Sequence, residues 1–325
     1  MSWRRAPSRG QPKPEKLPGT IDLLGEAFAL LGQRPYLVLV PIVLDLFLWL
    51  GVGLPATAFT AHLGNVLRKF PSVDVRLIDD ITGAGKNYNL MGLLGINTPS
   101  LMGHVSRGAL STPIERLLLT GLPWWSIPAL GVLIAVIGLA LGMMYLTMLK
   151  YVVYRQAVPV RLLWRQTWAN TRRMLGFVCA AALVLLLLML PLALFGAILL
   201  IVGIDAFPIL AFLMSLEAVW AFLMLFFAQY AIVDSSAGVF RAAYLSYNIV
   251  RRNPWSAAGF ICVYFIIVDG MPVALHILLS SAWGVVLAMI INAYVASSAL
   301  IAAMLFYRER AKRLPGPILE AAEVA

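Results

Sequence analysis

Charged residues are scarce in this chain of 325 residues. Asp, Glu, Lys and Arg together make up 12% of it, whereas 61% is hydrophobic. The mean hydropathy of +0.87 excludes a water-soluble globular protein, because a soluble core cannot bury so much apolar surface. The short alternating segments of outer-membrane barrels are also lacking. The composition therefore predicts an integral membrane protein of the all-α class.

Cysteine and the common catalytic motifs are equally rare. The two cysteines, Cys179 and Cys262, both fall within apolar runs, where a thiol packs as a small apolar group, so neither a disulfide nor a zinc site is expected. No H-E-x-x-H, G-x-S-x-G or C-x-x-C motif occurs, and the three histidines are far apart in the sequence. The sequence thus predicts no enzymatic activity, no metal site and no cofactor.

What the chain does have is a set of long apolar runs. A membrane-spanning helix needs about 20 apolar residues, and six runs meet this length. We therefore expect six transmembrane helices. They cover approximately Tyr36 to Phe59, Ile127 to Leu149, Met174 to Val202, Phe207 to Val233, Ala257 to Leu279 and Trp283 to Phe306.

The basic residues indicate the orientation of these helices. Of 25 Lys and Arg, 19 lie in the N-terminal region, in the connections 150–173 and 234–256, and in the C-terminal region, and these segments alternate with the remaining connections. Basic connections face the cytoplasm, so both termini are expected there. This distribution also explains the net charge of +10 without a nucleic-acid partner. Residues 1–19 and 311–325 are expected to be cytoplasmic tails, the first of them disordered, around a membrane domain at 20–310.

A short amphipathic helix followed by a basic cluster precedes every odd-numbered span. The clearest example is A-Y-L-S-Y-N-I-V-R-R-N-P-W, from Ala243 to Trp255, where aromatic side chains recur at helical spacing before Arg251 and Arg252. Similar segments end at Arg34-Pro35 and at Arg172-Arg173. The expected fold is thus a bundle of six helices built as three hairpins, each preceded by a cytoplasmic amphipathic helix.

Such helices suit the lipid headgroup layer, with aromatic rings at the interface and arginines on phosphate groups. The alternative is that they are ordinary loop helices packed against the bundle, which need the same amphipathic pattern. On the first interpretation, membrane lipids are the partners. The arginines expected to contact anionic lipid are Arg34, Arg161, Arg165, Arg172, Arg173, Arg251 and Arg252.

The run from Ala228 to Trp255, A-Q-Y-A-I-V-D-S-S-A-G-V-F-R-A-A-Y-L-S-Y-N-I-V-R-R-N-P-W, carries a resemblance to a known family. Its order of span, acid, helix and Arg-Asn-Pro resembles uncharacterised bacterial six-helix membrane proteins related to the membrane domain of glycerophosphodiester phosphodiesterases. The resemblance implies a three-hairpin fold in the bacterial cytoplasmic (inner) membrane. It implies no established activity and supplies no catalytic residues.

Three carboxylates fall inside the expected spans: Asp45, Glu217 and Asp269. An acid within a bilayer is energetically expensive and is a candidate for function. Together with His276 and Asn292 they form a candidate polar site for a proton or cation relay. The alternative is that each is a neutral or hydrogen-bonded contact between helices.

The connection of about 60–126 is too long for a simple outer loop. Within it, Leu90 to Met102 is too short to span a membrane and too apolar for open water. We expect this segment to lie on the membrane, to cap the bundle or to re-enter it.

Two functions from different classes remain open. The first is a non-catalytic accessory or organising membrane subunit that contacts anionic lipid, with a further protein partner in the membrane as an option. The second is a proton- or cation-coupled transporter or channel that uses the intramembrane acids. Acids that share one cavity would favour the second function, whereas acids that are separately capped would favour the first.

Overall fold

The computed structural model describes residues 18–70, 74–103, 117–157, 160–203 and 206–314. The expected tails at 1–19 and 311–325 therefore lie almost entirely outside the described residues. The described part is helical, and only two isolated β-bridges occur in it. The helices are α1 (Thr20–Gly32), η1 (Pro35–Val38), α2 (Leu39–Leu50), α3 (Thr57–Leu67), α4 (Val75–Asn87), η2 (Leu90–Gly95), α5 (Ser126–Val153), α6 (Val160–Ile201), α7 (Phe207–Leu225), α8 (Ala228–Ser235), α9 (Val239–Arg252), α10 (Pro254–Val268), α11 (Gly270–Leu275), η4 (His276–Ser280) and α12 (Ala282–Ala311).

Five segments of this fold are long and apolar enough to cross a membrane, and a sixth results where the two arms of a bent pair are counted as one span. The bent pair joins α1 to the segment Pro35–Leu50 at an angle of 96°. Its bend lies at Arg34-Pro35, as expected from the effect of proline on the preceding residue. The helical membrane architecture is thus confirmed, while the three-hairpin layout stays a prediction.

The first span is shorter than the expected Tyr36 to Phe59. Helix α2 ends at Leu50, and the chain is then extended until α3 begins at Thr57. Gly53 and Pro55 form the two β-bridges, with Leu118 and Asn89 respectively. The helix therefore ends before the apolar run does, because residues 53–55 pair with the outer connection instead of continuing the helix.

The second amphipathic segment is not a separate helix. Helix α6 runs without a break from Val160 to Ile201, through Arg172, Arg173 and Pro191. The segment begins after a proline instead of ending at one, so nothing in the sequence interrupts the helix before the span. The expected change of direction is therefore found before α2 and between α9 and α10, but not here.

Helix α12 forms the centre of the molecule. Of its most apolar stretch, 67% is buried, compared with 0% for the corresponding stretch of α6. The main core lies where α12 meets α1, α5, α8, α9 and α10. In this core Phe306 stacks on Phe227, at 5.0 Å between ring centroids, and also contacts Phe260, at 4.4 Å.

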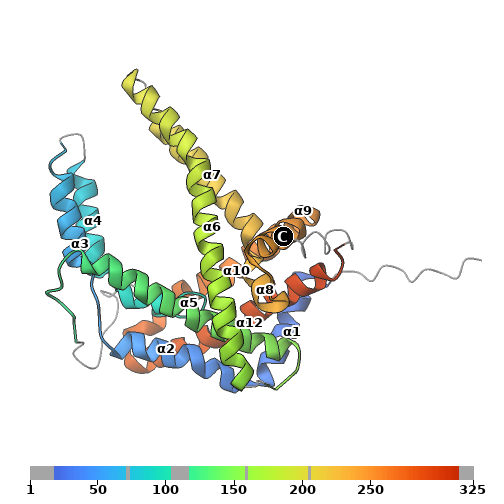
Figure 1. Cartoon of the computed structure of the whole chain (residues 1–325). Coiled ribbons are helices and arrows are strands. Elements are labelled where there is room, and N and C mark those ends of the chain that lie inside the picture. The colour runs from blue at the N-terminus through green and yellow to red at the C-terminus, as the bar shows by residue number, and fades with distance from the viewer. Residues whose placement is uncertain (1–17, 71–73, 104–116, 158–159, 204–205, 315–325) are drawn as a thin grey trace, which may run out of the picture.

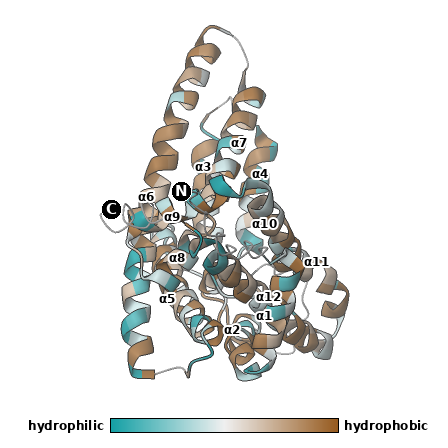
Figure 2. Cartoon of the chain, turned by 90° about the vertical axis from the view of Figure 1, so that its right-hand side faces the viewer, coloured by the Kyte–Doolittle hydropathy of each residue, from teal (hydrophilic) through white to brown (hydrophobic). Residues whose placement is uncertain are grey.

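The hairpin of α6 and α7 leans away from this centre. Figure 1 shows both helices projecting beyond the rest of the bundle, and the turned view in Figure 2 shows hydrophobic residues along most of the projecting part. Exposed apolar side chains of this kind are expected in lipid, where no hydrophobic force drives them together.

The outer connection contains a second helical pair, α3 and α4, at the far end of α5 (Figure 1). Gly85 of α4 lies directly against the side chain of Thr60 of α3, so that any Cβ there would overlap the hydroxyl oxygen. Arg68 and Asp79 join the same helices by an exposed ion pair at 3.6 Å. The connection is thus a folded cap where it is described, and residues 71–73 and 104–116 lie outside that description.

Candidate functional site

Asp45 of α2 is fully buried and holds the outer connection in the membrane domain. Its carboxylate accepts hydrogen bonds from the hydroxyl of Ser100 at 2.6 Å, from the backbone N–H of Leu101 at 2.9 Å and from that of Met102 at 3.1 Å. Hydrogen bonds to an ionised group are shorter and stronger than neutral ones. These donors explain how an acid is accommodated inside a span.

The segment that Asp45 holds enters the bundle. On α5, a Cβ at Gly138 would overlap the carbonyl oxygen of Leu93, and one at Gly142 would overlap that of Ile96. Gly142 lies near the middle of α5. Among the three expected placements of Leu90 to Met102, this packing against two glycines of an apolar helix favours re-entry, and residues 90–103 are called the re-entrant segment below.

The backbone of this segment is satisfied mainly by local partners. Asn89 begins η2, and its side-chain oxygen accepts from the N–H groups of Leu54 and Met91, at 3.0 and 3.2 Å. At the tip of the segment, residues 95–99, Asn97 adopts a left-handed conformation with φ of 58°. Irregular backbone at membrane depth is tolerated where protein buries it or where it lines a cavity. The segment meets this condition, because it packs against the glycines of α5 and is hydrogen-bonded to Asp45 of α2.

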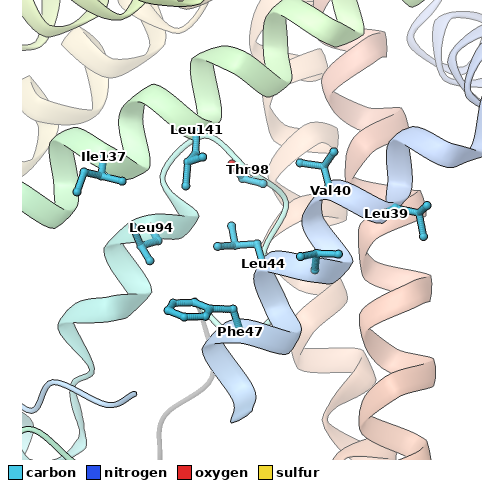
Figure 3. Close-up of a pocket in the computed structure, with 9 residues that line it drawn as sticks. Leu39, Val40, Leu44, Phe47, Leu94, Thr98, Ile137 and Leu141 are labelled. Carbon is cyan, nitrogen blue, oxygen red and sulfur yellow. The ribbon is translucent and has the colours of Figure 1, made fainter. Parts of the chain in front are cut away.

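A first cleft of about 590 Å³ lies between α2 and α5. Figure 3 shows Leu44 and Phe47 of α2 facing Leu94 and Ile137 across it, with Thr98 at its inner end. Its lining is apolar apart from Thr98. Such a cleft suits hydrocarbon and offers no set of polar groups for an ion.

A second cleft of about 870 Å³ lies on the other side of the re-entrant tip. Residues 95–99 form one of its walls, and α6, α7, α8, α10 and α12 contribute the others. Thr98 lines both clefts, so the tip separates them. The polar residues of the second cleft are Asn97, Thr98, Gln229 and Tyr264.

The five residues of the candidate polar site do not share either cleft. Asp45 is bonded to the re-entrant segment. Glu217 is half-buried on α7, while Asp269 and His276 are exposed at the two ends of α11. Asn292 is buried in α12, and its side-chain oxygen has no hydrogen-bond partner among the residues that the structure describes.

Helix α9 exposes its aromatic side chains. Phe240 is 70% exposed, and Tyr244 and Tyr247 also face outward, whereas the buried face consists of small and aliphatic residues such as Ala242 and Ile249. Arg251 and Arg252 are exposed at the end of the helix, and Trp255, just beyond it, is 90% exposed. The guanidinium of Arg251 lies 5.9 Å from the ring centre of Tyr247. Aromatic and basic groups therefore share one free surface.

The beginning of α6 has the same arrangement. Trp164 and Trp168 are 74% and 59% exposed, and Arg161, Arg165 and Arg172 are exposed beside them. The opposite face packs on α5, where Asn170 donates to the hydroxyl of Thr147 at 3.2 Å and Tyr151 donates to Gln166 at 2.9 Å.

The first amphipathic segment differs from the other two. Helix α1 buries Leu23, Ala27, Leu30 and Leu31 in the core that it shares with α12. Arg34 donates to the backbone oxygens of Tyr151 and Gln156 at the end of α5. Of the three segments, α1 thus fits the alternative of a packed helix, and lipid contact by Arg34 stays a prediction.

Several residues of this site were not candidates in the sequence. Ser100, Asn97 and Thr98 are ordinary polar residues of an apolar segment, and no motif marks them. Lys150 was counted only as a basic residue, yet its ammonium group donates to the backbone oxygens of Val233 and Asp234, at 3.0 and 2.9 Å. The sequence signal that pointed to them was Asp45, an acid within the first expected span, because such an acid requires hydrogen-bond donors from elsewhere in the chain.

Comparison of the chain with protein-family models, curated proteins and solved structures finds no match. The resemblance to the membrane domain of glycerophosphodiester phosphodiesterases therefore stays a prediction.

Proposed function

We propose that this chain is a non-catalytic integral membrane protein that organises anionic lipid, acting as an accessory or organising subunit in a bacterial cytoplasmic membrane. The observation that carries the proposal is the free surface of α9, where Phe240, Tyr244 and Tyr247 are exposed next to Arg251 and Arg252. In the proposed topology both termini are cytoplasmic and this surface lies on the inner leaflet, with the rings among the headgroups and the guanidinium groups on lipid phosphates.

The start of α6 supports the same role. Its exposed tryptophans and arginines repeat the pattern of α9 on a second element. A buried cytosolic helix would turn its aromatic face toward the bundle, whereas both of these helices turn small, aliphatic or polar side chains inward. Two such surfaces on one chain favour lipid contact over simple packing.

The experiment compares the parent with Arg251→Gln/Arg252→Gln in lipid nanodiscs that contain a small fraction of phosphatidylglycerol. Each basic residue near an anionic surface contributes about 1 kcal/mol, so the double variant should retain roughly 30-fold less phosphatidylglycerol at low salt. Raising the salt concentration should reduce the difference. The matched control is Lys69→Gln, an exposed cation at the other end of the molecule. Equal retention by parent and double variant across the salt series would refute the proposal.

Transport is the second candidate, and the re-entrant segment is the observation that favours it, because transport sites use irregular backbone near the membrane midplane. None of Asp45, Glu217 and Asp269 lines either of the two clefts, which weighs against an acid relay through them. Proton flux into proteoliposomes that depends on Asp269, and is lost in Asp269→Asn, would favour transport over the organising role.

A further inference from the structure

We propose that the second cleft binds an uncharged, carbonyl-bearing membrane lipid of the diacylglycerol class. Its hydrocarbon chains would fill the apolar part of the cleft, and its ester carbonyl would accept a hydrogen bond from the amide of Asn97. This site lies between α6, α7, α10, α12 and the re-entrant tip, apart from the basic surface of α9, and it does not depend on that surface.

The cleft exists because small side chains face one another across it. Ala181 and Ala182 of α6, Ala218 and Ala221 of α7, and Ala296 of α12 all line its walls. Its volume of about 870 Å³ is in the range of small-molecule sites, about 300–1,000 Å³. Larger side chains on these helices would close it, so the space is a property of the sequence.

The lining selects against a charged ligand. Among the described residues, no Asp, Glu, Lys or Arg lines the cleft, and its helical walls belong to segments that are long and apolar enough to span a membrane. An unpaired charge would lose its hydration there without compensation. Because the neighbouring faces of α6 and α7 are exposed apolar surface, the medium around the cleft is hydrocarbon, and its occupant enters from the membrane.

Polar groups at the re-entrant tip distinguish the cleft from a simple gap in lipid. Thr98 is 7% exposed, and neither its hydroxyl oxygen nor the amide nitrogen of Asn97 has a hydrogen-bond partner in the part of the chain that the structure describes. A buried donor without a partner costs about 1–3 kcal/mol. A rotation of the Asn97 side chain toward the cleft would pair this amide with a ligand carbonyl and remove that cost.

Diacylglycerol has the required chemistry. It combines two hydrocarbon chains with ester carbonyls and carries no charge, so it is able to reach a site near the middle of α5, where the tip contacts Gly142. Phosphatidylcholine has the same chains and esters, but its charged headgroup must stay at the membrane surface. This difference provides the control.

The test uses photoreactive diacylglycerol in phosphatidylcholine vesicles that contain the full chain, with the labelled residues identified by mass spectrometry. We expect labelling of cleft residues on α6, α7 and α10, and little labelling of them by photoreactive phosphatidylcholine. Two variants address the site independently. Asn97→Gly removes the amide but permits the positive φ, and Ala221→Trp fills the space.

Loss of one neutral hydrogen bond should reduce cleft labelling about fivefold in Asn97→Gly. Ala221→Trp should abolish it, whereas Leu187→Trp, on the exposed face of α6, should leave it unchanged. Equal labelling by the two lipids, labelling spread evenly over α6, or displacement of the probe by a short-chain quinone but not by diacylglycerol would each overturn the proposal. Because none of these readouts involves Arg251 or Arg252, failure here leaves the proposed organising role separately testable.

Discussion

Replacement of Asp45 should release the re-entrant segment while the rest of the bundle stays folded. Asp45→Leu removes the acceptor that the hydroxyl of Ser100 and the amides of Leu101 and Met102 share. Each unpaired buried donor costs about 1–3 kcal/mol, and removing one side of a buried charged contact typically costs about 3–5 kcal/mol. We therefore expect the local opening free energy to fall by about 3–5 kcal/mol.

Hydrogen exchange measured by mass spectrometry is the direct assay. A loss of about 3 kcal/mol in opening free energy corresponds to roughly 100-fold faster exchange, and it should be confined to peptides that cover residues 90–103. Asp45→Asn keeps the size of the side chain and one acceptor oxygen, so a smaller change of roughly tenfold is expected. Asp80→Leu, an exposed acid on α4, is the control and should change nothing in this segment. If folded Asp45→Leu exchanges in this segment at the parent rate, Asp45 does not anchor it.

Two further predictions use glycine positions, one to test the packing of α5 and one to test the orientation of the chain in the membrane. Gly142→Ala should destabilise the chain by about 1–3 kcal/mol, seen as a lower midpoint of thermal unfolding, because its Cβ would overlap the carbonyl of Ile96. Gly259→Ala, where a Cβ has no neighbour within 4 Å, should not, and equal midpoints for the two variants would contradict the packing argument. In a cysteine-free background, membrane-impermeant reagents applied to intact cells should label a cysteine at Gly83 and not one at Gly238, both positions with open space around the Cβ. The reverse pattern would invert the proposed topology.

The positions of most helices could be predicted from the sequence because long apolar runs and proline act locally. The bend at Arg34-Pro35 and the change of helix at Asn253-Pro254 were both expected, and both occur. The sequence did not show that α6 continues through Arg172 and Arg173, since a basic cluster does not by itself end a helix. Nor could it show that the helical part of the first span ends at Leu50, because this depends on pairing with residues 89 and 118.

The site was harder to predict, because its contacts join residues that are far apart in the sequence. Asp45 was recognised as an unusual acid, but its partners lie 55–57 positions further along the chain, and no local pattern links them. The apolar runs also do not distinguish side chains that face lipid from those that face protein, because both environments favour leucine and alanine. The clefts, which depend on where alanines of different helices meet, therefore needed the three-dimensional structure.

The most direct test of the central claim is the lipid composition of the protein after gentle extraction from its native membrane. If the chain organises anionic lipid, the lipids that remain with the purified parent should be enriched in anionic species relative to the bulk membrane. This enrichment should be lost in the variant in which Arg161, Arg165, Arg251 and Arg252 are replaced by Gln. A parent that carries lipid in the same proportions as the bulk membrane would contradict the claim.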